Sequence, residues 1–299
     1  MSFQLFIYYC AIAGGWAAFL AAMLVLGGVG EIKSTMLRAS LVGALVGTFV
    51  SAGIGFVDSL LNDKGTARFL RTGLCALLGF VAGILGGFVG QFLYEMAGVP
   101  ILSGWVLTGT LIGASLGAFD FIRGATGGGD KNSAMRKIIN GVMGGLVGGI
   151  LGGLPFTIVQ SFQTLNELFP RSSLATCLVL LGVLIGLSIG LAQVILKEAW
   201  IKVEEGFRSG RELMLSKEET TIGRAESCDL GLFGDNTIQK LHARILLRNN
   251  RYLLEHAGNE GETFLNDAPV TRKPVPLRAG DRIRIGKSVL QFGERQKRK

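Results

Sequence analysis

Residues that metal sites, disulfides and catalytic centres require are scarce in this chain of 299 residues. It contains two histidines, His242 and His256, and four cysteines, none of which forms a Cys-x-x-Cys pair. Zinc sites need clustered Cys and His ligands, and disulfide frameworks need several suitably spaced cysteines. There is also no P-loop, kinase catalytic loop or Gly-x-Ser-x-Gly elbow. We therefore predict no metal site, no cofactor and no enzymatic activity.

Charge is scarce in one part of the chain only. Residues 1–196 carry ten Lys or Arg and seven Asp or Glu, whereas residues 197–299 carry twenty and fifteen. Of the 45 glycines, 35 lie in the first two hundred residues. This split predicts a membrane domain at 1–196, a juxtamembrane helix or linker at 197–210, and a soluble domain at 211–299. The net charge of +8 is dispersed apart from a short basic tail at 295–299. We expect this tail to be solvated or weakly attracted to anionic lipid head groups, and we predict no nucleic-acid partner.

The first 196 residues contain long apolar stretches. A bilayer core of about 30 Å needs roughly 20 residues of helix, and only helices satisfy their own backbone groups in lipid. The beginning of the chain lacks the basic segment of a cleavable signal peptide. Six stretches are long enough to span, at Leu5–Leu26, Leu37–Val57, Phe69–Tyr94, Ile101–Ile122, Ile138–Phe162 and Leu174–Leu196.

Lysine and arginine in the connections predict the orientation. Seven basic residues follow the second and fourth spans, and three lie in the connections on the other side. The positive-inside rule then places both termini in the cytoplasm. We predict a multi-pass protein of a bacterial inner membrane.

Glycines recur every four residues in five of the spans. Residues at this spacing lie on one helix face, and small residues let backbones approach closely in a membrane. The pattern predicts glycine-zipper packing within the chain or between copies in a homo-oligomer, and a conduction path is the alternative. The stripes are Gly43, Gly47, Ser51 and Gly55; Gly79, Gly83 and Gly87; Gly109, Gly113 and Gly117; Gly141, Gly145, Gly149 and Gly153; and Gly182, Gly186 and Gly190.

The second, fourth and sixth spans also resemble one another, with Leu-x-Gly-x-Leu-x-Gly beginning at residues 41, 107 and 180. This predicts three hairpin repeats of the same orientation. Asp58, Asp120 and Gln193 close these spans at the cytoplasmic side. They are predicted to form solvated helix ends or contacts that fix the hairpins. An ion or substrate vestibule is the alternative.

After the last span, residues 196–207 are predicted to continue the helix, with Trp200, Val203 and Phe207 on one side. From Glu212 onward, short alternating stretches separated by turn residues predict strands. Residues 243–247, 251–255 and 288–292 have this pattern. Evenly spaced strands in about ninety residues are typical of a β-sandwich.

Several motifs in the soluble region occur in a characteristic order. They are Glu212–Leu215, Thr221–Arg224, Leu241–Ile245, Thr263–Asn266 and Ala279–Gly286. This order resembles a forkhead-associated (FHA) domain, over about Arg211–Gly293, in a membrane-anchored bacterial protein. The resemblance implies an all-β sandwich that reads phosphothreonine peptides.

The resemblance implies a role for individual residues. Arg224, which follows Gly223, matches the arginine that contacts the phosphate, and a guanidinium suits a dianion. The family's phosphate-binding serine is replaced by Gln239, whose amide can still donate to the phosphopeptide, and Lys240, which follows it, can supply charge. His242 matches a histidine that holds the loop scaffold.

The family's Asn-Gly-Thr turn corresponds to Gly261-Glu262-Thr263 here. Thr263 matches the threonine of this peptide-binding turn. The asparagine that grips the peptide backbone is absent, and Glu262 brings negative charge. Asn259 is a candidate replacement after a shift of the loop.

Together these features predict a membrane-anchored FHA adaptor that recruits a cytoplasmic protein to the bilayer. The contact depends either on phosphothreonine or on a phosphate-independent surface. The alternative function is a small channel or transport-like protein that its FHA domain gates or assembles.

Overall fold

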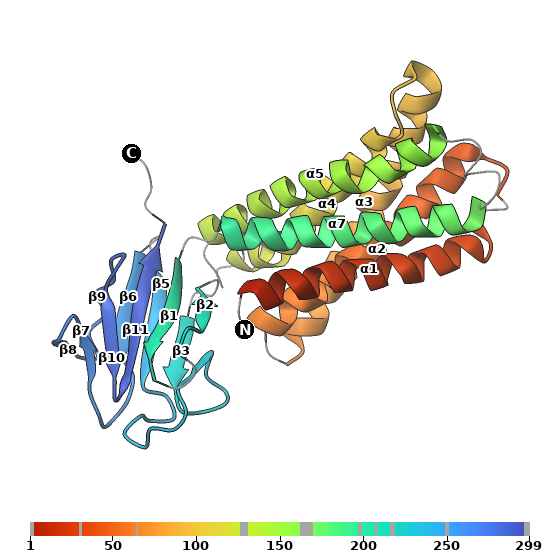
Figure 1. Ribbon diagram of the computed structural model, residues 1–299. Coiled ribbons are helices and arrows are strands. Elements are labelled where there is room, and N and C mark those ends of the chain that lie inside the picture. Colours follow the sequence, from red (N-terminus) through yellow and green to blue (C-terminus); the bar gives the residue numbers. More distant parts are fainter. Residues whose placement is uncertain are drawn as a thin grey trace. The chain divides into compact units, whose positions relative to one another are not determined.

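The computed structural model describes residues 3–29, 32–63, 65–125, 131–161, 170–196, 199–206, 209–215, 219–248 and 251–295. It divides into two compact units, residues 4–196 and residues 197–299 together with the first three residues. The first unit is helical and the second is built from strands (Figure 1).

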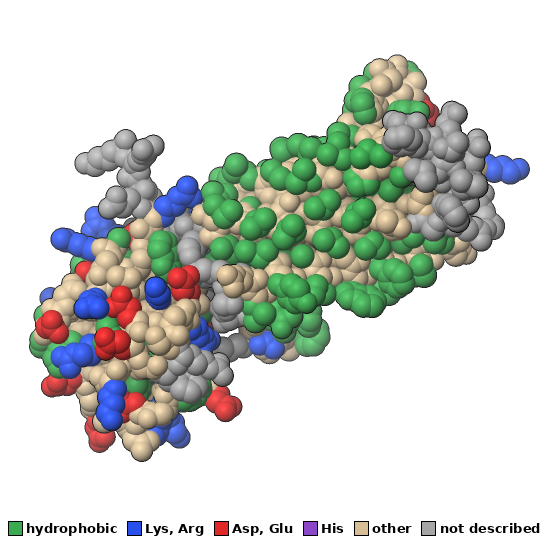
Figure 2. Space-filling view, in the orientation of Figure 1, with side chains coloured by type: hydrophobic (Ala, Val, Ile, Leu, Met, Phe, Trp, Pro, Cys, Tyr) green, Lys and Arg blue, Asp and Glu red, His purple; other side chains and the backbone are tan. Residues whose placement is uncertain are grey.

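Six helices in the described part of the first unit are long and apolar enough to cross a membrane. The predicted spans are confirmed as helices, and several helices extend beyond the predicted limits. Hydrophobic side chains cover much of the visible surface of this bundle (Figure 2). The helices are α1 (Phe3–Leu26), α2 (Thr35–Asn62), α3 (Ala67–Ala97), α4 (Leu102–Ala125), α5 (Lys131–Ser161) and α7 (Pro170–Ile195).

Glycines of one helix face the backbone of another. A Cβ on Gly83 of α3 would overlap the carbonyl of Gly43 in α2, and one on Gly141 of α5 would overlap that of Gly113 in α4. A Cβ on Gly182 of α7 would overlap the carbonyl of Gly14 in α1. These contacts join helices of different predicted hairpins. Because the chain itself covers these glycines, they are not open to a second copy.

Large aliphatic side chains fill the interior of the bundle. Ile54 of α2, Ile112 of α4, and Leu181 and Ile185 of α7 are almost fully buried. The buried hydroxyls of Ser51 and Ser115 lie 2.7 Å apart, and the Ser51 hydroxyl also donates to the carbonyl of Cys75. Aliphatic packing and internally paired hydroxyls therefore occupy this region.

The second unit is a sandwich of two sheets. The six-stranded sheet has the order β2-β1-β11-β10-β7-β8, and the five-stranded sheet has the order β4-β3-β5-β6-β9. The strands are β1 (Ala199–Glu205), β2 (Glu212–Met214), β3 (Glu219–Gly223), β4 (Leu230–Gly231), β5 (Ala243–Arg248), β6 (Arg251–His256), β7 (Thr263–Leu265), β8 (Ala268–Val270), β9 (Val275–Pro276), β10 (Arg282–Ile285) and β11 (Ser288–Glu294).

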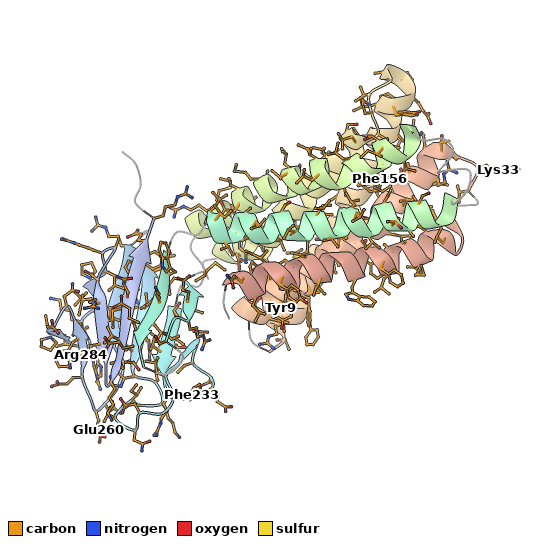
Figure 3. All side chains as sticks on the ribbon, in the orientation of Figure 1. Tyr9, Lys33, Phe156, Phe233, Glu260 and Arg284 are labelled. Carbon is orange, nitrogen blue, oxygen red and sulfur yellow. The ribbon has the colours of Figure 1, made fainter. Side chains whose placement is uncertain are left out.

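Alternating side chains build the sandwich core. Ile222, Ile245 and Leu254 of one sheet and Ile283 and Leu290 of the other belong to one buried cluster. On the opposite face of β10, the Arg284 guanidinium lies 4.0 Å from the centre of the Phe264 ring (Figure 3). The strands predicted at 243–247, 251–255 and 288–292 are confirmed.

The predicted juxtamembrane helix is wrong. Residues 199–205 form β1, which pairs with β11 from Ala199↔Glu294 onward. Ala199, Ile201 and Val203 are buried, and this spacing of two is the period of a strand. The helical reading followed Trp200, Val203 and Phe207 instead. The sandwich therefore begins at residue 199, before the predicted boundary at 211; residues 197–198, 207–208 and the tail 296–299 lie outside the described residues.

Candidate functional site

Strand pairing brings four loops to one end of the sandwich. Ile222 near the end of β3 pairs with Ala243 at the start of β5, and Ala243 pairs with His256 at the end of β6. In the other sheet, Thr263 pairs with Ile285 and with Val270. The segments 224–229, 232–242, 257–262 and 271–274 therefore lie at the same end of the sandwich. Glu260, labelled in Figure 3, belongs to one of them.

Arg224 directly follows β3, where the backbone comes close to that of Gln239 and Lys240. Its backbone N–H donates to the Gln239 carbonyl at 2.8 Å, and a Cβ on Gly223 would overlap the Lys240 carbonyl. Glycine at 223 is thus required for this approach. The Arg224 side chain is exposed, and its Nη1 donates to Oδ1 of Asn236 at 2.9 Å. The guanidinium is therefore held in place while donors remain for a ligand.

Gln239 and Lys240 lie beside Arg224 through these backbone contacts. Lys240 is exposed and supplies a second positive charge. Gln239 is half-buried, and its Oε1 accepts a hydrogen bond from the Asn259 backbone N–H at 2.8 Å. The amide of Gln239 therefore ties its own loop to the loop that follows β6.

The buried side chain of His242 connects the loop that carries Gln239 to the loop that follows β6. It is 1% exposed, its Nδ1 accepts from the Gln239 N–H at 3.2 Å, and its Nε2 lies 3.2 Å from the Glu262 carbonyl. Because Nδ1 is an acceptor, Nε2 carries the proton and donates. Burial lowers the pKa of His242, which favours this neutral ring. The ring is fully engaged between the two loops.

Asp235 fixes the loop that carries Asn236 and Gln239. Its Oδ1 accepts from the hydroxyl and the backbone N–H of Thr237, at 2.7 and 3.0 Å, and its Oδ2 accepts from the Lys287 N–H at 2.8 Å. The hydrogen bonds from Thr237, followed by that from Lys287, lower the pKa of Asp235 to about 2. Sequence reasoning missed Asp235 and Asn236. The local signal was an Asp two residues before a Thr, a common turn arrangement.

Thr263 does not belong to the exposed site. The sequence predicted it as a peptide-binding residue, but it is fully buried at the start of β7, and its hydroxyl lies 2.9 Å from Nδ1 of His256. It therefore supports the fold beneath the loop. Gly261, which stands in place of the family's asparagine, has φ +81° and packs against the His242 ring. Glu260 and Glu262 are exposed in this loop.

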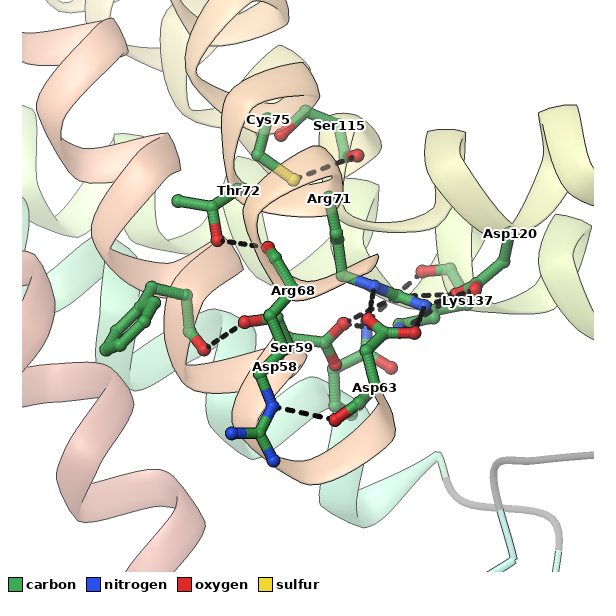
Figure 4. A network of polar contacts seen from close by, with 12 residues as sticks. Asp58, Ser59, Asp63, Arg68, Arg71, Thr72, Cys75, Ser115, Asp120 and Lys137 are labelled. Atoms are coloured by element: carbon green, nitrogen blue, oxygen red, sulfur yellow. Dashed lines mark hydrogen bonds and ion pairs between the residues drawn. The ribbon is translucent and has the colours of Figure 1, made fainter. Parts of the chain in front are cut away.

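A second polar cluster lies within the helical unit (Figure 4). Arg71 of α3 is 2% exposed; its Nη1 donates to Asp58 of α2 at 2.8 Å and to Asp120 of α4 at 2.9 Å, and its Nε contacts Asp63. Nζ of Lys137 in α5 lies 2.6 Å from Asp58 and 3.0 Å from Asp120. The cluster therefore joins four helices by ion pairs.

The structure thus brings Asp58 and Asp120 together, and Gln193 of α7 joins them by donating to the Lys137 carbonyl at 3.1 Å. The predicted orientation had counted Arg71 and Lys137 among the basic residues of the connections after the second and fourth spans. Both instead lie inside helices and serve as partners of the carboxylates. Without these two, the basic count still favours the predicted cytoplasmic side by five to three. These contacts fix helices against each other.

Comparisons with known proteins match the region of the chain that forms the sandwich. The family model for the FHA domain matches residues 220–286. FhaB of Mycobacterium tuberculosis, an FHA domain-containing protein, is 32% identical over 93 residues, which are 31% of this chain and 59% of FhaB. The glycogen accumulation regulator GarA of the same organism is 32% identical over 94 residues, which are 31% of this chain and 56% of GarA. This chain thus spans a little over half the length of these relatives.

Among solved structures, one from a study of phosphothreonine-dependent FHA domain interactions covers 33% of this chain and 98% of its own. It is 27% identical, with a TM-score of 0.30. The FhaA FHA domain, solved in complex with the intracellular domain of Rv3910, covers 31% of this chain and 98% of its own, with 26% identity and a TM-score of 0.29. Residues 220–286 are an FHA domain.

Proposed function

We propose that this chain is a membrane-anchored adaptor whose FHA domain binds a phosphothreonine-bearing protein and holds it at the bilayer. The position of the Arg224 side chain is the observation that carries the proposal. Its guanidinium is exposed at the loop end of the sandwich and is held by Asn236, with Lys240 beside it. A rigid donor fork with a neighbouring charge suits a phosphate dianion.

The loops that carry these residues are fixed in advance. Asp235 holds one loop to the Gly286–Lys287 turn, and His242 joins it to the loop that follows β6. Because the donors need little ordering when a ligand binds, less of the interaction free energy is lost. The family's asparagine is absent, and the side-chain amides of Asn236, Gln239 and Asn259 lie in the loops at this end of the sandwich.

The helical unit supports the anchoring part of the proposal. Six helices have the length and apolar composition of membrane spans, and exposed apolar side chains such as Trp16, Phe69 and Met96 suit contact with lipid. The basic connections favour cytoplasmic termini. Protease added to intact cells should then leave the sandwich undigested. Digestion of the sandwich by external protease would show that the predicted orientation is wrong.

Packing inside the bundle favours an anchor over a channel. Large aliphatic side chains occupy the interior, and Asp58 and Asp120 are engaged by Arg71 and Lys137. We expect no ion flux from liposomes that contain the protein. Flux that disappears in Asp58→Asn or Asp120→Asn variants would support the transport alternative instead.

Calorimetry on the full chain in nanodiscs tests the adaptor proposal. A phosphothreonine peptide library should bind, and the unphosphorylated peptides should bind at least tenfold more weakly. Arg224→Ala should lower phosphopeptide affinity at least tenfold, about 1.4 kcal/mol. Arg248→Ala is the matched control, because Arg248 is exposed at the opposite end of β5. Equal binding of phosphorylated and bare peptides would leave only phosphate-independent docking.

A further inference from the structure

The end of the sandwich opposite the four loops of the candidate site carries a group of arginines. The hairpin between β5 and β6 pairs Arg248 with Arg251. Next to Arg251, the Tyr252 carbonyl accepts a hydrogen bond from the Leu277 N–H at 2.8 Å, which brings Arg278 alongside. The three arginines are exposed. We refer to Arg248, Arg251 and Arg278 as the arginine cluster.

The positive charge of the arginine cluster is uncompensated in the described part of the chain. Arg248 and Arg251 are directly opposite each other, and like charges at such positions destabilise a sheet. Among the described residues, no side chain of the cluster forms an ion pair. Glu219, which is exposed at the start of β3, pairs with Arg244 at 3.4 Å, and Asp281 accepts from a backbone N–H at 2.7 Å. An anionic partner would therefore relieve the repulsion within the cluster.

The chain enters the sandwich at this same end. The carbonyl of Ala199, the first residue of β1, accepts from the Leu215 N–H at 3.1 Å, and the Leu215 carbonyl accepts from the Tyr252 hydroxyl at 3.4 Å. Tyr252 adjoins Arg251. Ile195, the last residue of α7, precedes Ala199 by four positions, and four residues span at most about 14 Å. The covalent chain therefore keeps the arginine cluster within reach of the bilayer in which α7 is proposed to lie.

The basic tail starts at this end as well. Glu294 in β11 pairs with the first residue of β1, and Arg295, which follows it, is exposed. The tail contains three further Lys or Arg in positions 296–299, which lie outside the described residues. The loops of the candidate site instead carry the exposed carboxylates of Glu226, Glu260 and Glu262 among their cations. An anionic surface is therefore attracted by the end with the arginine cluster and meets exposed carboxylates at the loop end.

We propose that the arginine cluster binds the anionic head groups of acidic phospholipids in the bilayer that anchors the chain. Guanidinium groups match phosphate oxygens well, and an anionic leaflet attracts basic residues held close to its surface. Docking by this end directs the loops around Arg224 away from the lipid, by about 20 Å along β1, and leaves them open to a cytoplasmic protein. This inference rests on the proposed membrane anchor and goes beyond phosphopeptide binding.

The test uses the full chain in nanodiscs of phosphatidylcholine, with or without phosphatidylserine. Ala279 is exposed and adjoins Arg278, so a fluorophore on Ala279→Cys, in a Cys228→Ser background, reports on this end of the sandwich. The other three cysteines are buried. A nitroxide on the lipid head groups should quench the fluorophore more strongly when phosphatidylserine is present. High salt should remove the difference, because it screens exposed charges.

Two matched pairs of substitutions assign the effect to the arginine cluster. Arg251→Gln combined with Arg278→Gln should lower the ratio of docked to free sandwich about 25-fold, or about fivefold for each cation removed from the anionic surface. Lys273→Gln combined with Lys287→Gln removes the same charge from the loop end and should change the ratio less than twofold. Arg251→Lys combined with Arg278→Lys keeps the charge and should retain docking. Phosphopeptide affinity should stay within twofold in all of them, which shows that the sandwich remains folded.

The outcomes separate this proposal from the adaptor function. Equal quenching with and without phosphatidylserine, or equal losses in the arginine and lysine pairs, would overturn lipid docking and leave phosphopeptide binding intact. Loss of phosphopeptide discrimination with unchanged quenching would overturn phosphothreonine binding alone. A chain that does not incorporate into nanodiscs would overturn the anchor and lipid docking together. Binding of an RNA oligonucleotide that requires Arg251 and Arg278, without any effect of phosphatidylserine, would assign the cluster to nucleic acid and overturn the proposal.

Discussion

In the helical unit, Gly83 of α3 lies against the backbone of Gly43 in α2, whereas in the sandwich Ile222, Leu254 and Leu290 fill the space between the sheets. The proposed membrane location of the helical unit would account for this contrast. In water, burying aliphatic surface is the main driving force, but in lipid an aliphatic side chain gains little by leaving its surroundings. Close backbone packing then matters more.

The two units also differ in how far their ion pairs are exposed to solvent. Arg71 is 2% exposed and is surrounded by carboxylates of α2 and α4. Arg282 in the sandwich pairs with Glu204 at 2.9 Å, but its side chain is 63% exposed. The guanidinium–carboxylate ion pair is therefore almost shielded from solvent in the helical unit and largely solvated in the sandwich. The four predictions below separate the two situations, beginning with the largest expected effect.

Removing the buried cation should have the largest consequence. Arg71→Ala removes the ion-pair partner of the buried Asp63 and leaves Lys137 as the cation beside Asp58 and Asp120, so we expect about 3–5 kcal/mol of destabilisation. Thermal unfolding in detergent measures it. Arg38→Ala is the control, because Arg38 is exposed on α2, and it should change stability by less than about 0.5 kcal/mol. Equal effects of the two substitutions would contradict the role of the cluster.

The second prediction compares two glycines of α3. Gly83→Ala inserts a methyl group into the Gly43 backbone and should destabilise by about 1–3 kcal/mol. Gly73 is exposed and a Cβ there meets nothing within 4 Å. Gly73→Ala should therefore stabilise the helix, by up to about 1 kcal/mol. Unfolding in the same detergent measures both, and effects of the same sign would argue against close glycine packing.

The third prediction concerns pH dependence in the sandwich. The folded pKa of Asp235, about 2, lies below the usual value of about 3.9. Its stabilisation is therefore present above pH ~4 and lost as the pH falls through 2. Asp235→Asn should be less stable than wild type at pH 7, and the difference should shrink toward pH 2.

Fluorescence of Trp200 during urea unfolding measures this difference, in a background where Trp16 and Trp105 are replaced by phenylalanine. Asp267→Asn, at an exposed hairpin turn, is the control and should show no comparable convergence. A stability difference for Asp235→Asn that stays constant between pH 7 and pH 2 would count against the ionised carboxylate as the stabilising group.

The smallest effect is expected for Arg282→Ala. Its ion pair with Glu204 is largely exposed, and such pairs contribute about 0–1 kcal/mol, less in high salt. Unfolding in urea at two salt concentrations should reveal a small, screened loss. A loss as large as that of Arg71→Ala would mean that burial does not distinguish the two ion pairs.

Local patterns were sufficient for much of this molecule. The apolar runs predicted six helices, and alternating residues predicted β5, β6 and β11. The motifs around Arg224 and His242 indicated an FHA domain, and residues 220–286 match that family. Each of these signals lies within a few consecutive residues.

Contacts between distant residues decided the rest. Strand β1 was mistaken for a helix because its partner, β11, lies about ninety residues further along the chain. Lys137 and Asp58 are 79 residues apart, so no local pattern could join them. Thr263 is buried by the fold despite its place in a binding motif. The sequence alone determined the six apolar helices and most of the strands and turns, because periodicity and turn chemistry are local. Only the tertiary structure decided which charges and which hydroxyls are buried, because burial depends on what the fold places beside them.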